Sequence, residues 1–520
     1  MPKQTTLLII LDGWGVPAKN FFGSAITRKT APNFFNWLRE YPHTELEASG
    51  TAVGLSKGQE GNSEAGHLNI GAGRVVKQDM MYILEAIKDG SFIKNSAFHQ
   101  ALHHAKKYQT SVHVMGLLSN HNSAHSCPEH LYALLDFFQL EGVKKVYLHL
   151  FTDGRDSGQH DAHIHFSKLE KHLHGNMKLA TVMGRYYAMD RNKMWDRTEA
   201  AYNAIVAGQG KKAKDMEEAL TMAYNSGETD EFISPTVIYD DGKPVATVKD
   251  NDVVFFFNLR SDRARQLAKA FVQPDFGKDN PGAFHRKFKP KNIRFVAMTD
   301  FGPDLPGIFT AFPSRDVHNS LVQVLCPRSQ LYIAESEKFA HVTYFFNGGY
   351  AQHFCNEKWV KIESDHIKDF DGQPAMKAGE IIEHLTKAIE SGAYDFITAN
   401  FANADMIGHT GNLPMAEKSV KILNNALLRI VNFALEHSTT VIITADHGNA
   451  EEMINATTGE IDSEHSINRV PFMIITSREE IKKRRIKKIL NKGKLADIAP
   501  TILKLMDIPQ PAEMTGRPLF

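Results

Sequence analysis

The chain has 520 residues, of which 42% are hydrophobic and 23% are charged. This composition is typical of a globular protein, and the length exceeds what one hydrophobic core usually supports, so we expect two domains. Lysine plus arginine and aspartate plus glutamate each number 60, which gives a formal net charge of zero. That balance excludes the overall basic charge of a nucleic-acid or membrane-surface binder, so we expect neither partner.

The cysteines and the N-terminus predict the compartment. Cys127, Cys326 and Cys355 are odd in number, far apart and without a CxxC motif. This usage predicts reduced thiols, no disulfide framework and a cytoplasmic location. The segment "MPKQTTLLIILDGWG" has too short an apolar run for a signal peptide, and no segment reaches the roughly 20 apolar residues that a membrane span needs. We therefore expect a soluble, unprocessed protein.

Short β-rich segments alternate with longer helical patterns along the chain. In chain order, strands are expected at 5–11, 111–118, 144–151, 252–259, 293–301, 394–401 and 439–445. Helices are expected at 160–173 and 415–436, among others. The alternation predicts an α/β fold with a largely parallel, buried sheet. The basic run at 478–494 fits a surface helix with isoleucines on one face better than a nucleic-acid patch.

Polar clusters follow several of these strands. They read "LDGWG", "LLSNHNSAHS", "FTDGRD", "NLRSDRAR", "NFANADMIGH" and "TADHGNAE". Ligands of open α/β sheets bind at the carboxyl ends of strands, so the chemistry is expected in these six segments.

Carboxylates and imidazoles in these segments form a candidate metal constellation. Asp12 and the pair Asp446–His447 each follow an apolar strand directly, and Asp405 and His409 stand four apart at a predicted helix start. His465 supplies a further imidazole late in the chain. Each element alone also fits an ordinary solvated pair. Together they offer enough oxygen and nitrogen ligands for two metal ions, and the lack of cysteine favours Mn, Zn, Mg or Co over a thiolate site.

Ser63 lies in the glycine-rich segment "GQEGNSEAGHLNIGAGR". The segment matches neither the P-loop nor the GxSxG pattern, because Ala65 stands where the latter requires glycine. A divalent cation bound to the hydroxyl would make the serine a nucleophile, and the glycines would let backbone N–H groups approach a phosphate. A plain turn serine remains the alternative.

Several long motifs resemble one known family. They are "LLIILDGWG", "GNSEAGHLNIGAGR", "FTDGRD", "GRYYAMDR", "EKFAHVTYFFNGG", "NFANADMIGHTG", "TADHGNAEEM" and "AEMTGRPLF". From about residue 5 to the end, the chain resembles the 2,3-bisphosphoglycerate-independent phosphoglycerate mutases of the alkaline phosphatase superfamily. The resemblance implies interconversion of 3- and 2-phosphoglycerate through a phosphoserine, with two Mn²⁺ ions (Mg²⁺ or Co²⁺ in some members), no 2,3-bisphosphoglycerate and a monomeric enzyme.

The resemblance also implies a domain plan, an alkaline-phosphatase-like domain with an inserted second α/β domain. The metal domain would comprise residues 1–77 and 311–520, and the substrate-binding transferase domain residues 78–310. The sequence supports an insertion independently, because Asp12 and Ser63 must meet Asp405 and Asp446 from the other end of the chain.

Residue roles follow from the matching motifs. One metal ion would be held by Asp405, His409 and His465, and the other by Asp12, Ser63, Asp446 and His447. Ser63 would carry the phosphoryl group, Lys338 would stabilise its charge, and Asp156 would move protons between the substrate hydroxyls. Substrate contacts would come from His125, Arg155, Asp156, Arg185, Arg191, Arg260, Arg263 and Lys338. Arginine forks suit a substrate that carries both a carboxylate and a phosphate.

The chain departs from the family pattern in two loops. "LLSNHNSAHSC" replaces the usual "LSDGGVHSH" and is one residue longer before His125, and "KIESDHIKDFDGQPAMKA" at 361–378 lacks the usual wording. Two other functions stay open. A metal-dependent phosphomonoesterase or phosphopentomutase would share the metal ligands but lack the glycine-rich serine motif, and a catalytically silent metabolite-binding homologue would tolerate loss of Ser63.

Overall fold

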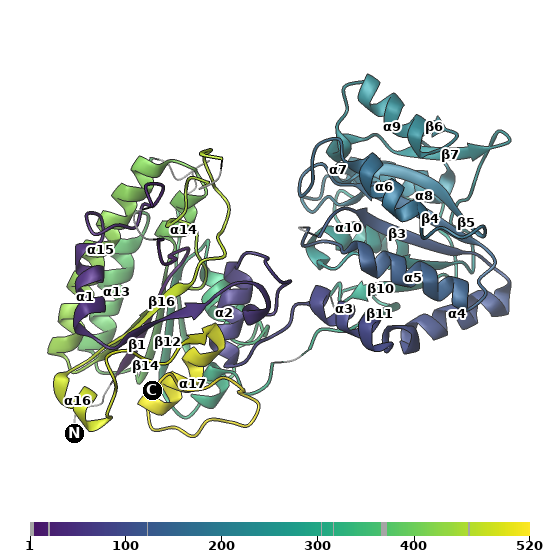
Figure 1. Ribbon diagram of the computed structural model, residues 1–520. Coiled ribbons are helices and arrows are strands. Elements are labelled where there is room, and N and C mark those ends of the chain that lie inside the picture. The colour runs from purple at the N-terminus through teal and green to yellow at the C-terminus, as the bar shows by residue number, and fades with distance from the viewer. Residues whose placement is uncertain are drawn as a thin grey trace. The chain divides into compact units, whose positions relative to one another are not determined.

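The computed structural model describes residues 5–18, 21–121, 123–302, 304–315, 317–365, 372–455 and 458–520. It divides the chain into two compact units. Unit 1 comprises Met1–Gln78 and Asp316–Phe520, and unit 2 comprises Asp79–Arg315. Both ends of the chain therefore belong to unit 1, and the middle of the chain forms a separate unit (Figure 1).

Unit 1 is built on an eight-stranded sheet with the order β13-β12-β14-β1-β15-β16-β2-β17. The strands are β1 (Thr6–Leu11), β2 (His43–Glu47), β12 (Gln330–Glu335), β13 (Lys358–Ile362), β14 (Phe396–Phe401), β15 (Thr440–Thr444), β16 (Val470–Ile475) and β17 (Gly493–Lys494). The five strands from β13 to β15 are parallel, and β16 runs antiparallel to both neighbours. β1, β14 and β15 are buried along their whole length, which explains the mainly apolar sequences of β1 and β15, whereas β14 also buries the polar Thr398 and Asn400.

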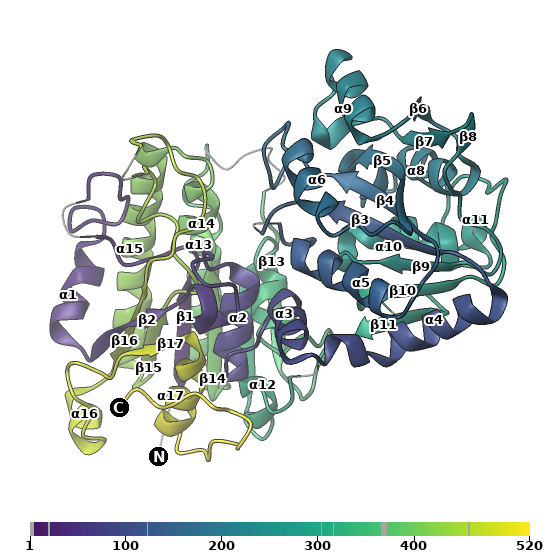
Figure 2. The ribbon, with the colours of Figure 1, turned by 45° about the vertical axis from the view of Figure 1, so that its right-hand side comes forward.

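Helices cover both faces of this sheet (Figures 1 and 2). On one face lie α1 (Pro32–Glu40), α13 (Ala378–Glu390) and α15 (Leu413–Glu436), and on the other lie α2 (Ser63–Ala72) and α17 (Ile498–Leu505). The remaining helical turns of unit 1 are η1 (Gly50–Val53), α12 (Leu321–Val324), η4 (His341–Phe345), α14 (Asn403–Gly408), α16 (Arg478–Lys483) and η5 (Leu495–Asp497). Each fully buried Leu, Ile or Val in this core stabilises the fold by about 1.5–3 kcal/mol.

Unit 2 has its own sheet, with the order β11-β10-β9-β3-β4-β5-β7-β6 and β8 paired to β7. The strands are β3 (Val112–Leu118), β4 (Val146–Thr152), β5 (Met177–Gly184), β6 (Lys211–Ala213), β7 (Thr236–Asp240), β8 (Lys243–Pro244), β9 (Val253–Phe256), β10 (Arg294–Thr299) and β11 (Ile308–Phe312). The pairings from β11 to β5 are all parallel, and β7 runs antiparallel to β5.

Two hydrophobic clusters fill the two faces of the second sheet. Along β3, Val112 and Val114 belong to one cluster and Met115 and Leu117 to the other, as the alternation of a strand requires. The first cluster includes residues of α3 (Asp79–Asp89), α4 (Ser96–Tyr108), α5 (Pro128–Leu140), α6 (Ala162–Glu170) and α9 (Met216–Asn225). The second includes residues of α7 (Arg185–Ala188), α8 (Trp195–Ala207), α10 (Ser261–Val272) and α11 (Phe276–Asp279). Two short turns, η2 (Phe92–Lys94) and η3 (Asp230–Phe232), complete the unit.

The α/β fold class and the seven predicted strands are confirmed, as are both named helices, with ends that shift by a few residues. The helix predicted for the basic run at 478–494 is shorter than expected, because only Arg478–Lys483 is helical. Of the isoleucines expected on one face, Ile486 is buried but Ile489 is 66% exposed. Among the residues that the structure describes, no helix has both the length and the apolar character needed to cross a membrane.

The expectation of reduced thiols is wrong for two of the three cysteines. Cys326 and Cys355 form a disulfide with their Cα atoms 5.4 Å apart, and Cys127 is free and buried. Cys326 follows α12 and Cys355 precedes β13, so the turn into β12 and the pairing of β12 with β13 bring the two segments together. The two cysteines are 29 residues apart in the sequence, and no sequence motif indicates that they pair.

Candidate functional site

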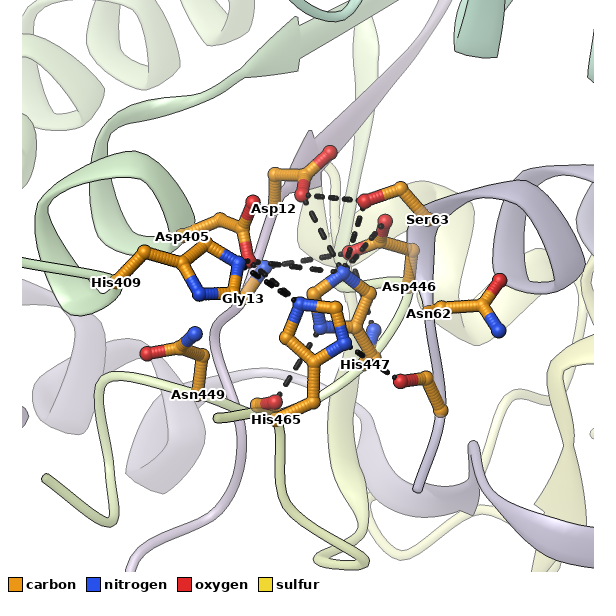
Figure 3. Close-up of polar contacts among 12 residues, drawn as sticks. Asp12, Gly13, Asn62, Ser63, Asp405, His409, Asp446, His447, Asn449 and His465 are labelled. Atoms are coloured by element: carbon orange, nitrogen blue, oxygen red, sulfur yellow. Dashed lines mark hydrogen bonds and ion pairs between the residues drawn. The ribbon is translucent and has the colours of Figure 1, made fainter. Parts of the chain in front are cut away.

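The candidate site of unit 1 lies at the carboxyl ends of three neighbouring parallel strands, β1, β14 and β15. Asp12 follows β1, Asp405 lies in α14 directly after β14, and Asp446 and His447 follow β15. Because these strand ends meet at one edge of the sheet, residues from both ends of the chain converge there (Figure 3).

Ser63 enters the same site from the N-terminus of α2. Asn62 caps this helix, since its side chain accepts a hydrogen bond of 2.9 Å from the backbone N–H of Ala65. The Ser63 hydroxyl donates to Asp12 Oδ1 at 3.0 Å and lies 2.9 Å from His447 Nε2 (Figure 3). Ser63 is thus the first residue of a helix and not a turn serine.

Two glycines allow this convergence. A Cβ atom on Gly66 would lie 2.6 Å from the backbone oxygen of Asp446, and one on Gly13 would lie 2.7 Å from the Cα atom of Asp405. Gly13 also has a φ of +70°, in the left-handed region that favours glycine. The strand end and the helix can therefore approach the acidic residues only without side chains at these positions.

Asp12, Asp446 and His447 form the first cluster of potential metal ligands, with one ligand atom of each within 4.8 Å of the others. All three side chains are fully buried, and His447 Nε2 lies 3.5 Å from Asp12 Oδ1 and 3.5 Å from Asp446 Oδ2. Burial acts to lower the pKa of His447, but the charges of Asp446, Asp12 and Asp405 outweigh it and raise the pKa well above its usual value.

Asp405, His409 and His465 form the second cluster. Asp405 Oδ1 lies 3.4 Å from His409 Nε2 and 3.3 Å from His465 Nε2, and the two Nε2 atoms are 3.0 Å apart. Burial acts to raise the pKa of Asp405, but Lys338 and both imidazoles hold it well below its usual value.

The orientation of the three imidazoles fits metal binding. In each, Nδ1 lies next to a backbone carbonyl oxygen: His409 at 2.7 Å from Ser463, His465 at 2.8 Å from Gly61, and His447 at 3.3 Å from Gly448. A carbonyl holds Nδ1 in its protonated form and leaves Nε2 as the electron-pair donor, the usual arrangement behind a metal-ligating histidine.

The carboxylates fit as well. Asp405 Oδ1 and Asp446 Oδ2 are buried and accept no hydrogen bond of regular geometry among the described residues, and their nearest nitrogen neighbours are imidazoles at 3.2–3.5 Å. A buried carboxylate oxygen without a regular hydrogen bond is costly, and a divalent cation would satisfy it. The donor set therefore suits a pair of divalent ions that accept oxygen and nitrogen ligands.

Lys338 supplies the positive charge between the two clusters. Its ammonium group donates to Asp12 Oδ1 at 2.7 Å, to Ser63 Oγ at 2.8 Å and to Asp405 Oδ2 at 2.6 Å. Burial acts to lower the pKa of Lys338, but these carboxylates raise it above its usual value. The lysine is therefore a fixed cation that touches the serine hydroxyl.

The candidate substrate residues gather at the strand ends of unit 2. Arg185 follows β5 and is only 3% exposed, and its guanidinium donates to Asp153 at 2.6 Å and to Asp156 at 2.9 Å. Asp156 also accepts a hydrogen bond of 2.8 Å from Ser123. Burial acts to raise the pKa of Asp156, but Arg185 and Ser123 hold it below its usual value, so the carboxylate is ionised.

Further arginines surround this pair. Arg191 contacts Asp262 at 2.7 Å, and Arg260 approaches the same carboxylate at 3.9 Å. The pKa of Arg263 is lowered by burial and then by the positive charges of Arg185, Arg191 and Arg155, while the carboxylate of Asp262 acts in the opposite direction. Burial next to Arg185 also lowers the pKa of His125 to about 4, so this imidazole is neutral at physiological pH.

Sequence reasoning missed several residues that hold these sites together. His67 Nδ1 lies 3.2 Å from Asp446, Asn400 donates to Asp12 at 2.7 Å, and the buried Glu451 accepts backbone N–H bonds at 2.9 Å from Gly15 and 2.8 Å from Asn449. His67 and Asn400 lie within two of the family motifs given above. A polar residue at a strand end or at a helix start was the sequence signal that could have identified them. In unit 2, Asp153 was missed in the same way.

An α/β chain that holds a serine between a lysine and two sets of carboxylates and imidazoles has the architecture of a metal-dependent phosphoryl-transfer enzyme.

Comparisons with known proteins agree. The family model described as "BPG-independent PGAM N-terminus" matches residues 83–303. The chain is 44% identical to the 2,3-bisphosphoglycerate-independent phosphoglycerate mutase of Clostridium acetobutylicum over 524 residues, with 100% of both chains covered. It is 44% identical to that of Clostridium perfringens strain SM101, with 99% of both covered.

A solved structure of Leishmania mexicana phosphoglycerate mutase, determined at low cobalt concentration, matches 100% of this chain and 98% of its own, with a TM-score of 0.74 and 26% identity. The chain belongs to the family of 2,3-bisphosphoglycerate-independent phosphoglycerate mutases.

Proposed function

We propose that the protein interconverts 3-phosphoglycerate and 2-phosphoglycerate through a phosphoserine at Ser63, without 2,3-bisphosphoglycerate. The observation that carries the proposal is the environment of the Ser63 hydroxyl, which contacts Asp12 and Lys338 within 3.0 Å at the N-terminus of a helix. A helix N-terminus and an ammonium group both favour negative charge, so they would stabilise a phosphoryl group on this oxygen.

A pair of Mn²⁺ ions, or Mg²⁺ or Co²⁺, is proposed as the resident metal. One ion would be held by Asp405, His409 and His465. The other would be held by Asp12, Ser63, Asp446 and His447. When bound, the ions would lower the pKa of the serine hydroxyl and offset the charge of the phosphoryl oxygens.

The insert, residues 78–310, is proposed to bind the glycerate part of the substrate. Arg155, Arg185, Arg191, Arg260, Arg263 and His125 are the proposed contacts. Arginine pairs bidentately with carboxylate and phosphate, and Arg155, Arg185 and Arg191 already pair with carboxylates of unit 2, so their guanidinium groups are positioned for an anionic ligand.

Asp156 is proposed to move protons between the two substrate hydroxyls. Asp156 is ionised, so it can accept a proton, although its lowered pKa makes it a weak base, and hydrogen bonds from Arg185 and Ser123 fix its position. Water must be kept from the phosphoserine, because hydrolysis would turn the mutase into a phosphatase; Ser63 is only 6% exposed. The expected monomeric state and cytoplasmic location stay predictions.

The test is Ser63→Ala in the full-length protein, with Mn²⁺ present and 2,3-bisphosphoglycerate absent. Conversion of 3- to 2-phosphoglycerate, followed by phosphorus NMR, should fall to background, whereas Ser167→Ala, on the exposed face of α6, should retain wild-type turnover. Substantial turnover by Ser63→Ala would overturn the phosphoserine route. Release of inorganic phosphate by the wild type without isomerisation would favour a phosphomonoesterase instead.

A further inference from the structure

A second kind of ligand cluster belongs to unit 2, whereas the strand-end carboxylates belong to unit 1. His121, Cys127 and Glu129 each offer one ligand atom, and these atoms lie within 4.8 Å of one another. His121 Nε2 is 3.1 Å from Glu129 Oε1, and the Cys127 thiol donates to Glu129 Oε2 at 3.1 Å. The two oxygens of one carboxylate thus face an imidazole on one side and a sulfur on the other.

The start of α5 creates this arrangement. Cys127 is the N-cap residue, Pro128 occupies the first turn, and Glu129 follows it in that turn. Cys127 makes no side-chain cap bond to the helix, so its sulfur is directed to Glu129 and not to the backbone. His121 comes from the preceding loop and is 62% exposed in its side chain, so an ion from solvent can reach the cluster.

We propose that His121, Cys127 and Glu129 bind one zinc ion, with water as the fourth ligand. Thiolate, imidazole and carboxylate are all ligands that Zn²⁺ accepts, and tetrahedral geometry with bonds of about 2.0–2.3 Å places ligand atoms roughly 3.3–3.7 Å apart. His121 Nε2 and Cys127 Sγ each lie 3.1 Å from a different oxygen of Glu129, and one ligand atom of each residue lies within 4.8 Å of the others, so the side chains would close in by up to about 1 Å to reach this geometry. Because sulfur is a soft ligand, this site favours zinc over the Mn²⁺ or Mg²⁺ that suits the oxygen-rich clusters of unit 1.

Binding needs no oxidant or reductant. The Cys127 S–H bond breaks as the sulfur–zinc bond forms, and the proton passes to solvent, so one proton is released per ion bound. The hydrogen bond from the thiol to Glu129 is exchanged for two bonds to the metal.

The position of the cluster gives zinc a role in holding the adjacent loop. Between His121 and Cys127 lie Ser123, which donates to Asp156 at 2.8 Å, and His125, whose carbonyl accepts the backbone N–H of Leu259 at 2.7 Å. An ion bound to His121 and Cys127 would restrain Ser123, which lies between them in the chain and donates to Asp156. The three ligands are therefore positioning residues for unit 2.

The experiment uses Co²⁺ as a spectroscopic substitute for zinc in the full-length protein, without reductant. Among the described residues, the two ligand clusters of unit 1 contain no sulfur, so only Cys127 can give a thiolate-to-cobalt charge-transfer band. The wild type should develop this band to one equivalent of Co²⁺ even when Mn²⁺ is in excess, and added Zn²⁺ should remove it. Ser63→Ala should show the same band, which separates this result from the fate of the mutase proposal.

Variants decide whether three ligands act together. Cys127→Ser should lose the band, and His121→Ala and Glu129→Gln should weaken cobalt affinity by at least about 10-fold. His103→Ala, an exposed histidine on α4, is the matched control and should bind cobalt like the wild type. If Cys127→Ser does not fold, His121→Ala and Glu129→Gln still test the proposal, because these two ligands are more exposed. The proposal is overturned if the wild type gives no band, or if His121→Ala and Glu129→Gln bind cobalt as tightly as the control.

Discussion

Lys338→Met tests whether the lysine balances the buried acids of unit 1. The ammonium contacts Asp12 at 2.7 Å and Asp405 at 2.6 Å, and its side chain is only 7% exposed. Methionine keeps the length of the side chain but removes the charge, which leaves these carboxylates without their nearest cation. Removing one partner of a buried ion pair costs about 3–5 kcal/mol. For a unit of this size we expect the melting temperature in EDTA to fall by about 6–10 °C.

Metal should reverse most of this loss. Divalent ions bound by the two clusters would supply the positive charge that the lysine no longer provides, and binding to the folded state alone raises stability. Mn²⁺ should therefore raise the melting temperature of Lys338→Met by more than that of the wild type. Calorimetry with EDTA and with Mn²⁺ gives both values. The control is Lys361→Met on β13, where an exposed pair with Glu363 contributes at most about 1 kcal/mol.

Two results would refute the reasoning. The first is a Lys338→Met protein that melts in EDTA within the range of the Lys361→Met control, which would mean that the buried acids are not held by this charge. The second is equal stabilisation of variant and wild type by Mn²⁺, which would mean that the ions and the lysine do not act on the same carboxylates.

Three further outcomes are expected. Arg185→Met should lower the unfolding free energy of unit 2 by about 3–5 kcal/mol at pH 7. Arg185 lowers the pKa of Asp156 below 3.8, so the difference in unfolding free energy between wild type and variant, measured by denaturant titration, should narrow as the pH falls below that value. In thiol titration of the native, non-reduced protein, Cys127 should be unreactive, because burial raises its pKa to about 12. Denaturation should expose one reactive thiol, and reduction of the denatured protein should give three. Gly66→Ala should weaken Mn²⁺ binding at least about tenfold by calorimetric titration, because its Cβ would displace Asp446.

Much of the architecture was predictable from local sequence. Mainly apolar runs such as those of β1 and β15 mark strands buried on both faces, and the polar residues that follow them mark one edge of the sheet. That rule, with the resemblance to one family, brought Asp12, Asp405 and Asp446 to attention, and the structure places them together.

The remainder depends on tertiary contacts that no local pattern encodes. The disulfide between Cys326 and Cys355 follows from how β12 lies beside β13. The cluster of His121, Cys127 and Glu129 escaped notice for a related reason. Its spacing matches no familiar metal motif, and only the direction of each side chain at the start of α5 shows that the three converge.

The two units carry different charged groups at their strand ends, and this difference orders the proposed reaction. At the strand ends of unit 1, the buried carboxylates of Asp12, Asp405 and Asp446 surround Lys338, so a phosphate there meets carboxylate charge until divalent ions bind. At the strand ends of unit 2, Arg155, Arg185 and Arg191 pair with carboxylates, and each guanidinium has further N–H groups through which an anion can bind without a metal ion. Phosphoglycerate should consequently bind the arginines with or without Mn²⁺, whereas transfer to Ser63 should begin only after the ions are in place.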